Sequence, residues 1–204
     1  FNMIRKHIKI EPQRWYYHCD RIGMLVWQDM VNGGRDYKSW YVTYMATAME
    51  GMHIRAKDTR IHLMGRQDPA GQRKFKKEMK ETVRLLYNHP SIVTWVIFNE
   101  GWGQFQTKKM TDIVRAEDPY RLTDSASGWF DQGCGDIRSI HDYFFPLHVT
   151  PEKRVTALTE FGGYSLQIPK HSMYEKKVYG YKKFKRKREL TAGYEKLIKK
   201  LIIP

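Results

Sequence analysis

Two glutamates, Glu100 and Glu160, each follow a short run of strand-forming residues. The run before Glu100, Ile92–Phe98, is apolar, β-branched and aromatic, which is typical of a strand buried on both faces of a parallel sheet. The run before Glu160, Val155–Thr159, is also short and β-prone. Parallel strands present their carboxyl ends at one edge of a sheet, so we expect the two carboxylates to face one another. Such a pair, one protonated and one ionised, is what hydrolysis of a glycosidic bond requires.

An amide and several glycines surround the first glutamate. Asn99 precedes Glu100, and Gly101-Trp102-Gly103 follows it. Glycines let the backbone turn sharply and let a ligand approach closely. A carboxylate beside an amide at the carboxyl end of a buried parallel strand lies where α/β barrels keep their catalytic residues.

The rest of the chain predicts strands and helices in alternation, which favours a parallel sheet. Strands are expected at residues 2–8, 24–27, 92–98, 121–125, 137–141 and 155–160. Helices are expected from Pro12 to Gly23, from Asp68 to about Tyr87, over Thr107–Ala116 and over Thr191–Ile203. The fold class is therefore α/β, with about six parallel strands of an incomplete (β/α)8 TIM barrel. An open doubly wound sheet is the competing architecture, but no GxGxxG motif follows a strand here.

A long, irregular stretch, Val31–Gln67, follows the second strand and Asp29. Connections of this length are usually functional or mobile. It should overhang the same end of the sheet as Glu100. Its aromatic residues would form a sugar-stacking wall, or the stretch would fold as a small subdomain with short helices.

The chain has 204 residues, enough for one core but fewer than the roughly 250 of a complete barrel. Its net charge of +14 is concentrated in residues 170–200, which carry +9 and include Lys182–Arg188. That segment predicts either a solvated, basic helix entry or a patch for an anionic polymer such as nucleic acid. No apolar run approaches the roughly 20 residues of a membrane span, so no membrane association is expected.

Cys19 and Cys134 predict free thiols, since two cysteines make no disulfide framework. Neither has metal-site spacing around it, and we expect no metal and no cofactor. No signal peptide is visible, and the chain opens on a strand at Phe1, which suggests a fragment. The compartment, cytoplasmic or secreted and periplasmic, stays open.

Five motifs, in this order and across nearly the whole chain, together resemble glycoside hydrolase family 2. They read FNMIRKH, WYYHCDRIGMLVWQD, SIVTWVIFNEGWG, IHDYF and LTEFGG. The resemblance implies that residues 1–204 are part of a (β/α)8 catalytic barrel, covering its strands two to seven. It also implies that strands one and eight, and the β-sandwich domains that normally flank this barrel, are missing.

The resemblance implies a role for four residues. The acid/base would be Glu100 and the nucleophile Glu160, with retention of configuration and with the carboxyl groups about 5–5.5 Å apart. Asn99 would bond the sugar 2-hydroxyl, and Tyr143 would donate to Glu160 and help to keep it ionised. Taken alone, Asn99 and Tyr143 could equally satisfy buried backbone groups.

Further side chains at the predicted strand ends could line the sugar pocket. Arg5 and His7 end one strand and His141 ends another, although a lone histidine at a strand end is often structural. Asp29 would bond a sugar hydroxyl or form a salt bridge with Arg5. Two loop tryptophans, Trp102 and Trp129, would stack on a sugar or simply pack.

The first hypothesis is thus a retaining exo-β-glycosidase, β-galactosidase-like, acting on a β-galactoside or a related carbohydrate. A β-glucuronidase would need cationic contacts, for which Lys6, Arg35 and Arg55 are candidates; β-mannosidase specificity is also open. The second hypothesis is an inactive, carbohydrate-binding remnant, because an open barrel leaves strand edges unpaired. On that ground we expect the chain alone to be poorly active. A nucleic-acid-binding function ranks last, and we expect no nucleic-acid partner.

Overall fold

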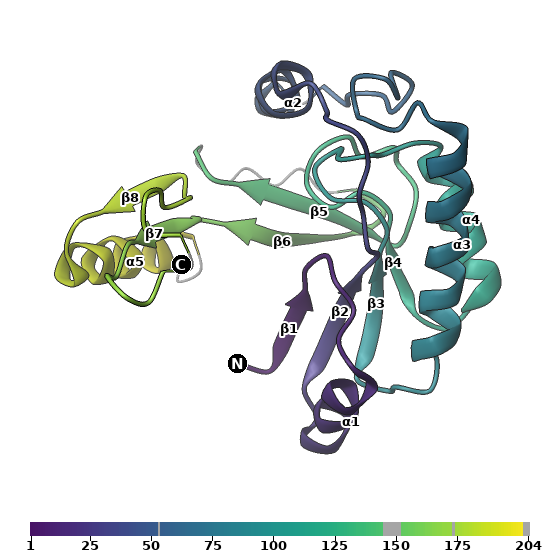
Figure 1. Cartoon of the computed structure of the whole chain (residues 1–204), viewed down its shortest axis with the longest axis horizontal. Helices are drawn as coiled ribbons and strands as arrows, with labels where there is room; N and C mark the ends of the chain where they lie inside the picture. The colour runs from purple at the N-terminus through teal and green to yellow at the C-terminus, as the bar shows by residue number, and fades with distance from the viewer. Residues whose placement is uncertain (53, 145–151, 173, 202–204) are drawn as a thin grey trace. The chain divides into compact units, whose positions relative to one another are not determined.

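A single sheet of six strands organises the computed structural model, which describes residues 1–52, 54–144, 152–172 and 174–201 (Figure 1). The strands follow one another across the sheet in chain order: β1 (Met3–Lys6), β2 (Leu25–Asp29), β3 (Ile92–Val96), β4 (Leu122–Asp124), β5 (Ile137–Asp142) and β6 (Val155–Phe161). The pairs from β1 to β5 are all parallel. Parallel neighbours in strict chain order are the arrangement of a (β/α)8 barrel, and six strands are an incomplete one, as predicted.

Three amphipathic helices connect the strands of the first part of the chain: α1 (Gln13–Ile22), α3 (Pro69–Leu86) and α4 (Thr107–Glu117). Gly23 ends α1 in the left-handed conformation, at φ 71°, as its sequence predicts. Asp68 caps α3 by accepting hydrogen bonds from the backbone of Ala70 and Gly71. Figure 1 shows α3 and α4 lying side by side along the outside of the sheet.

The core lies between the sheet and these helices. Trp95 on β3 is fully buried and donates from Nε1 to Asp118. Phe98 stacks on Phe75 of α3, with ring centroids 5.2 Å apart, and Phe105 meets both rings edge-on. Buried aromatic pairs of this kind add about 0.5–1.5 kcal/mol each beyond their burial. This packing fixes the carboxyl end of β3, where Asn99 and Glu100 follow.

The long stretch after β2 contains short helices, which is one of the two predicted alternatives. A π-helix, η1 (Trp40–Met45), continues directly into α2 (Ala46–Gly51). The segment before them runs back along the loop at Gly65, since Arg35 N donates to the Gly65 carbonyl at 2.9 Å. The stretch therefore contains short helices within the first part of the chain and also brings Tyr37 to the loop after β3.

The described residues form two compact units. The first contains residues 1–140 and 152–157, and the second contains residues 141–144 and 158–201. In the second unit β7 (Tyr164–Leu166) and β8 (Lys182–Phe184) pair in parallel, and α5 (Lys187–Leu201) packs on both.

The basic segment differs from its prediction as a helix entry. Lys182–Phe184 forms strand β8, and α5 begins at Lys187, four residues before the predicted start at Thr191. The alternating residues of Lys182–Phe184 let Lys182 lie over the rings of Tyr164 and Phe184, which a strand presents on one face. The predicted end of this helix, at Ile203, lies outside the described residues. None of the described helices is long and apolar enough to cross a membrane.

Candidate functional site

Three side chains from successive strands of the first unit form one polar network. Arg5, on β1, donates from Nε and Nη2 to the two carboxylate oxygens of Asp29, at 3.0 Å each. The same Nη2 also donates to Asn99 Oδ1 at 2.8 Å. A bidentate guanidinium–carboxylate pair is both strong and directional. Arg5 thereby fixes the geometry at the carboxyl ends of β1, β2 and β3.

His7 joins this network from the exposed side. Its Nδ1 lies 2.6 Å from Asp29 Oδ2, while the His7 side chain is 39% exposed and that of Asp29 only 3%. The carboxylate of Asp29 is therefore engaged by both Arg5 and His7. Of the two predicted roles for Asp29, the structure shows the salt bridge with Arg5.

Arg5 also determines which atom of Asn99 can meet a ligand. Because Asn99 Oδ1 accepts from Arg5, the amide nitrogen is the group left to donate to a hydroxyl. Asn99 itself is buried. A donor at this point suits the predicted contact with a sugar hydroxyl.

Glu100 has an unusual backbone. Its φ is +50°, in the left-handed region that residues with a side chain rarely adopt, and it is 4% exposed. Its backbone N–H donates to the Ser127 carbonyl at 2.9 Å, which carries the β3–β4 contact beyond the regular strands. A Cβ on Gly101, which has φ +76°, would lie 2.6 Å from the Phe130 ring. Local strain of this kind concentrates at functional sites.

The loop after Glu100 is anchored by a second network, which no pattern in the sequence predicts. Arg66 donates from Nε to the Gly103 carbonyl at 3.1 Å and from Nη2 to Asn32 Oδ1 at 2.6 Å. Asn32 in turn donates to the Trp102 carbonyl. Gly103 has φ +60°, and a Cβ there would lie 2.7 Å from Arg66 Nη2, so a side chain at this position would strain the backbone and displace the guanidinium.

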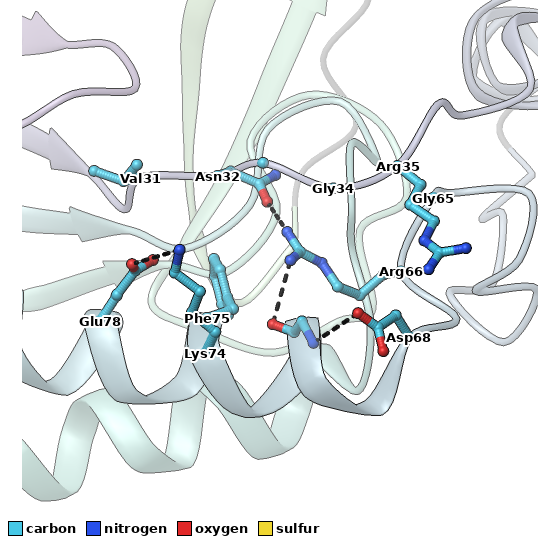
Figure 2. A pocket seen from close by; sticks show the side chains of 12 residues that line it. Val31, Asn32, Gly34, Arg35, Gly65, Arg66, Asp68, Lys74, Phe75 and Glu78 are labelled. Atoms are coloured by element: carbon cyan, nitrogen blue, oxygen red, sulfur yellow. Dashed lines mark hydrogen bonds and ion pairs between the residues drawn. The ribbon is translucent and has the colours of Figure 1, made fainter.

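Arg66 is a buried cation, and Figure 2 shows its guanidinium reaching Asn32 across a pocket of about 420 Å³. It is 5% exposed and lies over the rings of Phe75 and Phe105. Burial lowers the pKa of the guanidinium. Neutral acceptors and aromatic rings contact the guanidinium directly, and the carboxylates of Glu78 and Asp68 oppose the effect of burial from farther away. A buried arginine that is held between two rings and donates hydrogen bonds to loop residues keeps the loop in one conformation.

In the second unit, two side chains of the predicted site contact Glu160. Tyr143 Oη donates to Glu160 Oε2 at 2.5 Å, and His141 Nε2 lies 3.7 Å from Oε1. Tyr181 stacks on Tyr143 with ring centroids 3.8 Å apart. Sequence reasoning had no motif for Tyr181, whose signal is only its aromatic character. The hydrogen bond from Tyr143 to Glu160 is the contact that the resemblance implies for Tyr143.

The two predicted stacking tryptophans differ in exposure. Trp102 is partly exposed, meets His7 edge-on at 6.2 Å and lies parallel to Tyr37. Trp129 is 3% exposed, which favours the packing alternative for that side chain. Glu100 belongs to the first unit and Glu160 to the second, so their separation of about 5–5.5 Å stays a prediction.

Comparison with known proteins identifies the family. The model for "Glycosyl hydrolases family 2, TIM barrel domain" matches residues 2–159. A β-mannosidase B from Thermothelomyces thermophilus is 29% identical over 101 residues, which are 50% of this chain and 8% of that protein. A β-mannosidase B from Aspergillus clavatus is 30% identical over 109 residues, 53% of this chain and 10% of that protein. The chain thus spans a small part of these relatives.

Solved structures of low sequence identity share the fold. A β-D-glucuronidase from Dictyoglomus thermophilum matches with a TM-score of 0.55 and 15% identity, over 84% of this chain and 32% of that one. A family 2 β-galacturonidase from Eisenbergiella tayi, bound to glycerol, gives 0.51 and 19%, over 84% and 31%. With the family model covering most of its length and the strand order of a (β/α)8 barrel, the chain belongs to glycosyl hydrolase family 2, as part of its TIM barrel domain.

Proposed function

We propose that the protein carrying this chain is a retaining exo-β-glycosidase that removes terminal β-linked sugars by double displacement. One observation carries the proposal: one glutamate follows β3 and the other lies near the end of β6, two strands of one sheet, and the two have unlike surroundings. Glu100 is almost fully buried beside an amide, whereas Glu160, with 31% of its side chain exposed, accepts a hydrogen bond from Tyr143. Unlike surroundings can keep one carboxyl group protonated and another ionised, so that the first serves as the acid and the second as the nucleophile.

In the first step, Glu160 attacks the anomeric carbon while Glu100 donates its proton to the glycosidic oxygen. The carbon–oxygen bond to the leaving group breaks, and a glycosyl ester of Glu160 forms. In the second step, Glu100, now ionised, takes a proton from water, and the resulting hydroxide equivalent displaces Glu160 from the anomeric carbon. Two inversions at one carbon retain the configuration.

The remaining side chains support these steps. Asn99, oriented by Arg5, would donate its amide proton to the sugar 2-hydroxyl. Tyr143 stabilises the ionised form of Glu160, and His141 faces the other oxygen of the same carboxylate. Arg5, His7 and Asp29 act as a connected unit that positions Asn99, with His7 as its exposed member.

The sequence predicts a β-galactoside as the accepted sugar, but the relatives and solved structures that match this chain give that choice no support. The relatives at 29–30% identity are named β-mannosidases, so a β-mannoside is the first substrate to test. A uronic acid is less favoured by the side chains. Lys6 pairs with Glu11, and Arg55 pairs with Glu152 at 2.6 Å, so two of the three candidate cations already have acidic partners.

The test is a panel of nitrophenyl β-glycosides, assayed with the protein that carries this chain. Glu100→Gln should lower kcat/KM for the accepted glycoside by about 10²–10⁴-fold, as removal of a general acid does. Glu160→Gln should abolish measurable turnover, since no nucleophile remains. Glu81→Gln, at an exposed position on α3, is the matched control and should leave the rate unchanged.

Full activity in either glutamine variant would end the proposal. The competing interpretation, an inactive remnant that only binds carbohydrate, would give saturable sugar binding with no turnover on any member of the panel.

A further inference from the structure

A cavity of about 510 Å³ opens beside the loop that follows Glu100. Two segments of the first unit line it, residues 32–37 with Ser39 on one side and Trp102 with Gly103 on the other. Its volume is within the range of about 300–1,000 Å³ that small-molecule sites occupy. No step of the proposed reaction involves this cavity.

Two aromatic rings form one wall of the cavity. Tyr37 and Trp102 are nearly parallel, at an interplanar angle of 5°, with centroids 6.1 Å apart. At that distance the rings are offset rather than face to face, so they do not cover each other completely. Tyr37 is 37% exposed and Trp102 is partly exposed. An offset pair of parallel rings leaves part of each apolar ring face uncovered, and the C–H face of a pyranose can cover such a face.

The other walls carry groups that bind hydroxyls. Arg35 and Asp36 are exposed, and within the described residues neither forms an ion pair. Asn32 and Ser39 add an amide and a hydroxyl. A ligand with one apolar face and several hydroxyl groups, which is to say a sugar ring, matches this combination.

The residues that line the cavity indicate which sugar it receives. A general acid lies next to the glycosidic oxygen, between the attacked sugar and the leaving group. Trp102 and Gly103 follow Glu100 by two and three residues and line the cavity, whereas Arg5, Asp29 and Asn99, the network assigned to the attacked sugar, do not line it. We propose that the cavity is a subsite for the leaving sugar of a β-linked disaccharide, with Tyr37 and Trp102 as its stacking wall.

The wall is fixed before any ligand arrives. Asn32 donates to the Trp102 carbonyl, and the buried Arg66 engages both Asn32 and the Gly103 carbonyl. The Gly103 N–H donates to the Met64 carbonyl at 2.7 Å. A rigid wall loses little conformational entropy on binding, which favours affinity for the sugar ring.

This inference rests on the proposed glycosidase function, and the experiment separates the two. The protein that carries this chain is assayed on β-1,4-mannobiose and on β-mannosyl fluoride, and on lactose and β-galactosyl fluoride in parallel. Fluoride has no ring to stack, so the fluorides report only on the attacked sugar. Trp102→Ala and Tyr37→Ala should lower kcat/KM for the disaccharide at least tenfold more than for its fluoride.

Tyr120→Ala removes a tyrosine that is 84% exposed at the opposite end of the sheet, and is the matched control. It should leave both substrates and their ratio unchanged. An equal loss on both substrates in Trp102→Ala and Tyr37→Ala would overturn the subsite while leaving the glycosidase function intact. A wild-type protein that hydrolyses neither the disaccharides nor the fluorides would overturn the proposed function and the subsite with it.

Discussion

Arg5 is the residue on which the geometry around Asn99 depends. One guanidinium spans both oxygens of Asp29 and the amide oxygen of Asn99. A lysine keeps the charge but cannot provide this fork of donors. Arg5→Lys should therefore lower kcat/KM by about 10–100-fold, because a buried, misoriented Asn99 loses its bond to the sugar. Kinetics on the accepted nitrophenyl glycoside measure this.

Arg84→Lys is the matched control, since Arg84 makes the same two-oxygen contact with Glu117 on an exposed part of α3. Exposed pairs contribute little to function or stability. Arg5→Lys and Arg84→Lys with equal activity would show that Asn99 does not depend on Arg5.

Tyr143 makes a second testable contribution at this scale. Its hydroxyl donates to Glu160, which stabilises the ionised carboxylate. In Tyr143→Phe that donor is lost, so the acidic limb of the kcat/KM profile should move to higher pH. Tyr174→Phe, at a position that is 61% exposed, should leave the profile in place. An unmoved acidic limb in Tyr143→Phe would mean that the bond has no role in the ionisation of the nucleophile.

At the scale of the elements, the loop from Asn99 to Gln104 is fixed by side chains from two other segments. Arg66 lies between Phe75 and Phe105 and donates hydrogen bonds to the Gly103 carbonyl and to Asn32 Oδ1. Arg66→Met preserves much of the packing but leaves these acceptors without a donor. The free energy of unfolding should fall by about 2–4 kcal/mol. Urea unfolding, followed by tryptophan fluorescence, measures this change.

Arg73→Met, at an exposed position on α3, is the control and should change stability by less than about 0.5 kcal/mol. If Arg66→Met is as stable as Arg73→Met, the loop after Glu100 does not need the buried guanidinium.

The sequence predicted the elements well and their anchors poorly. Buried runs such as Ile92–Phe98, and signals such as Asp68 and Gly23, are local, and local patterns define strands and helix ends. The Arg66–Asn32 contact joins residues 34 positions apart in an irregular stretch, and no spacing rule predicts it. The segment Lys182–Phe184 was misread because a run of basic residues hides the alternation of a short strand.

The candidate site, too, could be predicted from the sequence only in part. Asn99 and Glu100 follow β3 and Glu160 lies near the end of β6, so their places were predictable from strand patterns. Their roles are those that the resemblance to family 2 implies. The contribution of Tyr37 to a wall with Trp102 depends on how the long stretch after β2 folds back. Composition could indicate that this stretch is rich in aromatic residues, but not which ring meets Trp102.

At the scale of the whole molecule, the fold depends on a buried acid, Asp118, that directly follows α4 and precedes β4. Burial raises the pKa of Asp118, but donors from Arg121, Trp95 and the Tyr120 backbone outweigh it and lower the pKa below its ordinary value. A lowered pKa in the folded state contributes stability above the unfolded pKa, and this is lost as pH falls through the folded pKa. Stability should therefore drop steeply below about pH 4.

Asp118→Asn should lower the free energy of unfolding at neutral pH by about 2 kcal/mol and flatten the acid limb of the stability profile. Asp112→Asn, at an exposed position on α4, is the control and should leave the profile as it is. Urea unfolding at a series of pH values measures this profile. If the acid limb of Asp118→Asn has the wild-type slope, Asp118 is not the group that makes stability fall at low pH.

The central claim is that Glu160 attacks the sugar and Glu100 transfers the proton. Rescue by azide tests it most directly, with Glu100→Ala and Glu160→Ala assayed on the dinitrophenyl β-glycoside of the accepted sugar. In Glu100→Ala the glycosyl ester of Glu160 still forms, and azide attacks it to give the β-glycosyl azide. In Glu160→Ala azide takes the place of the nucleophile and gives the α-glycosyl azide. NMR of the products distinguishes the two anomers. Opposite anomers are the predicted result, and the same anomer from both variants, or no azide product from either, would contradict the account.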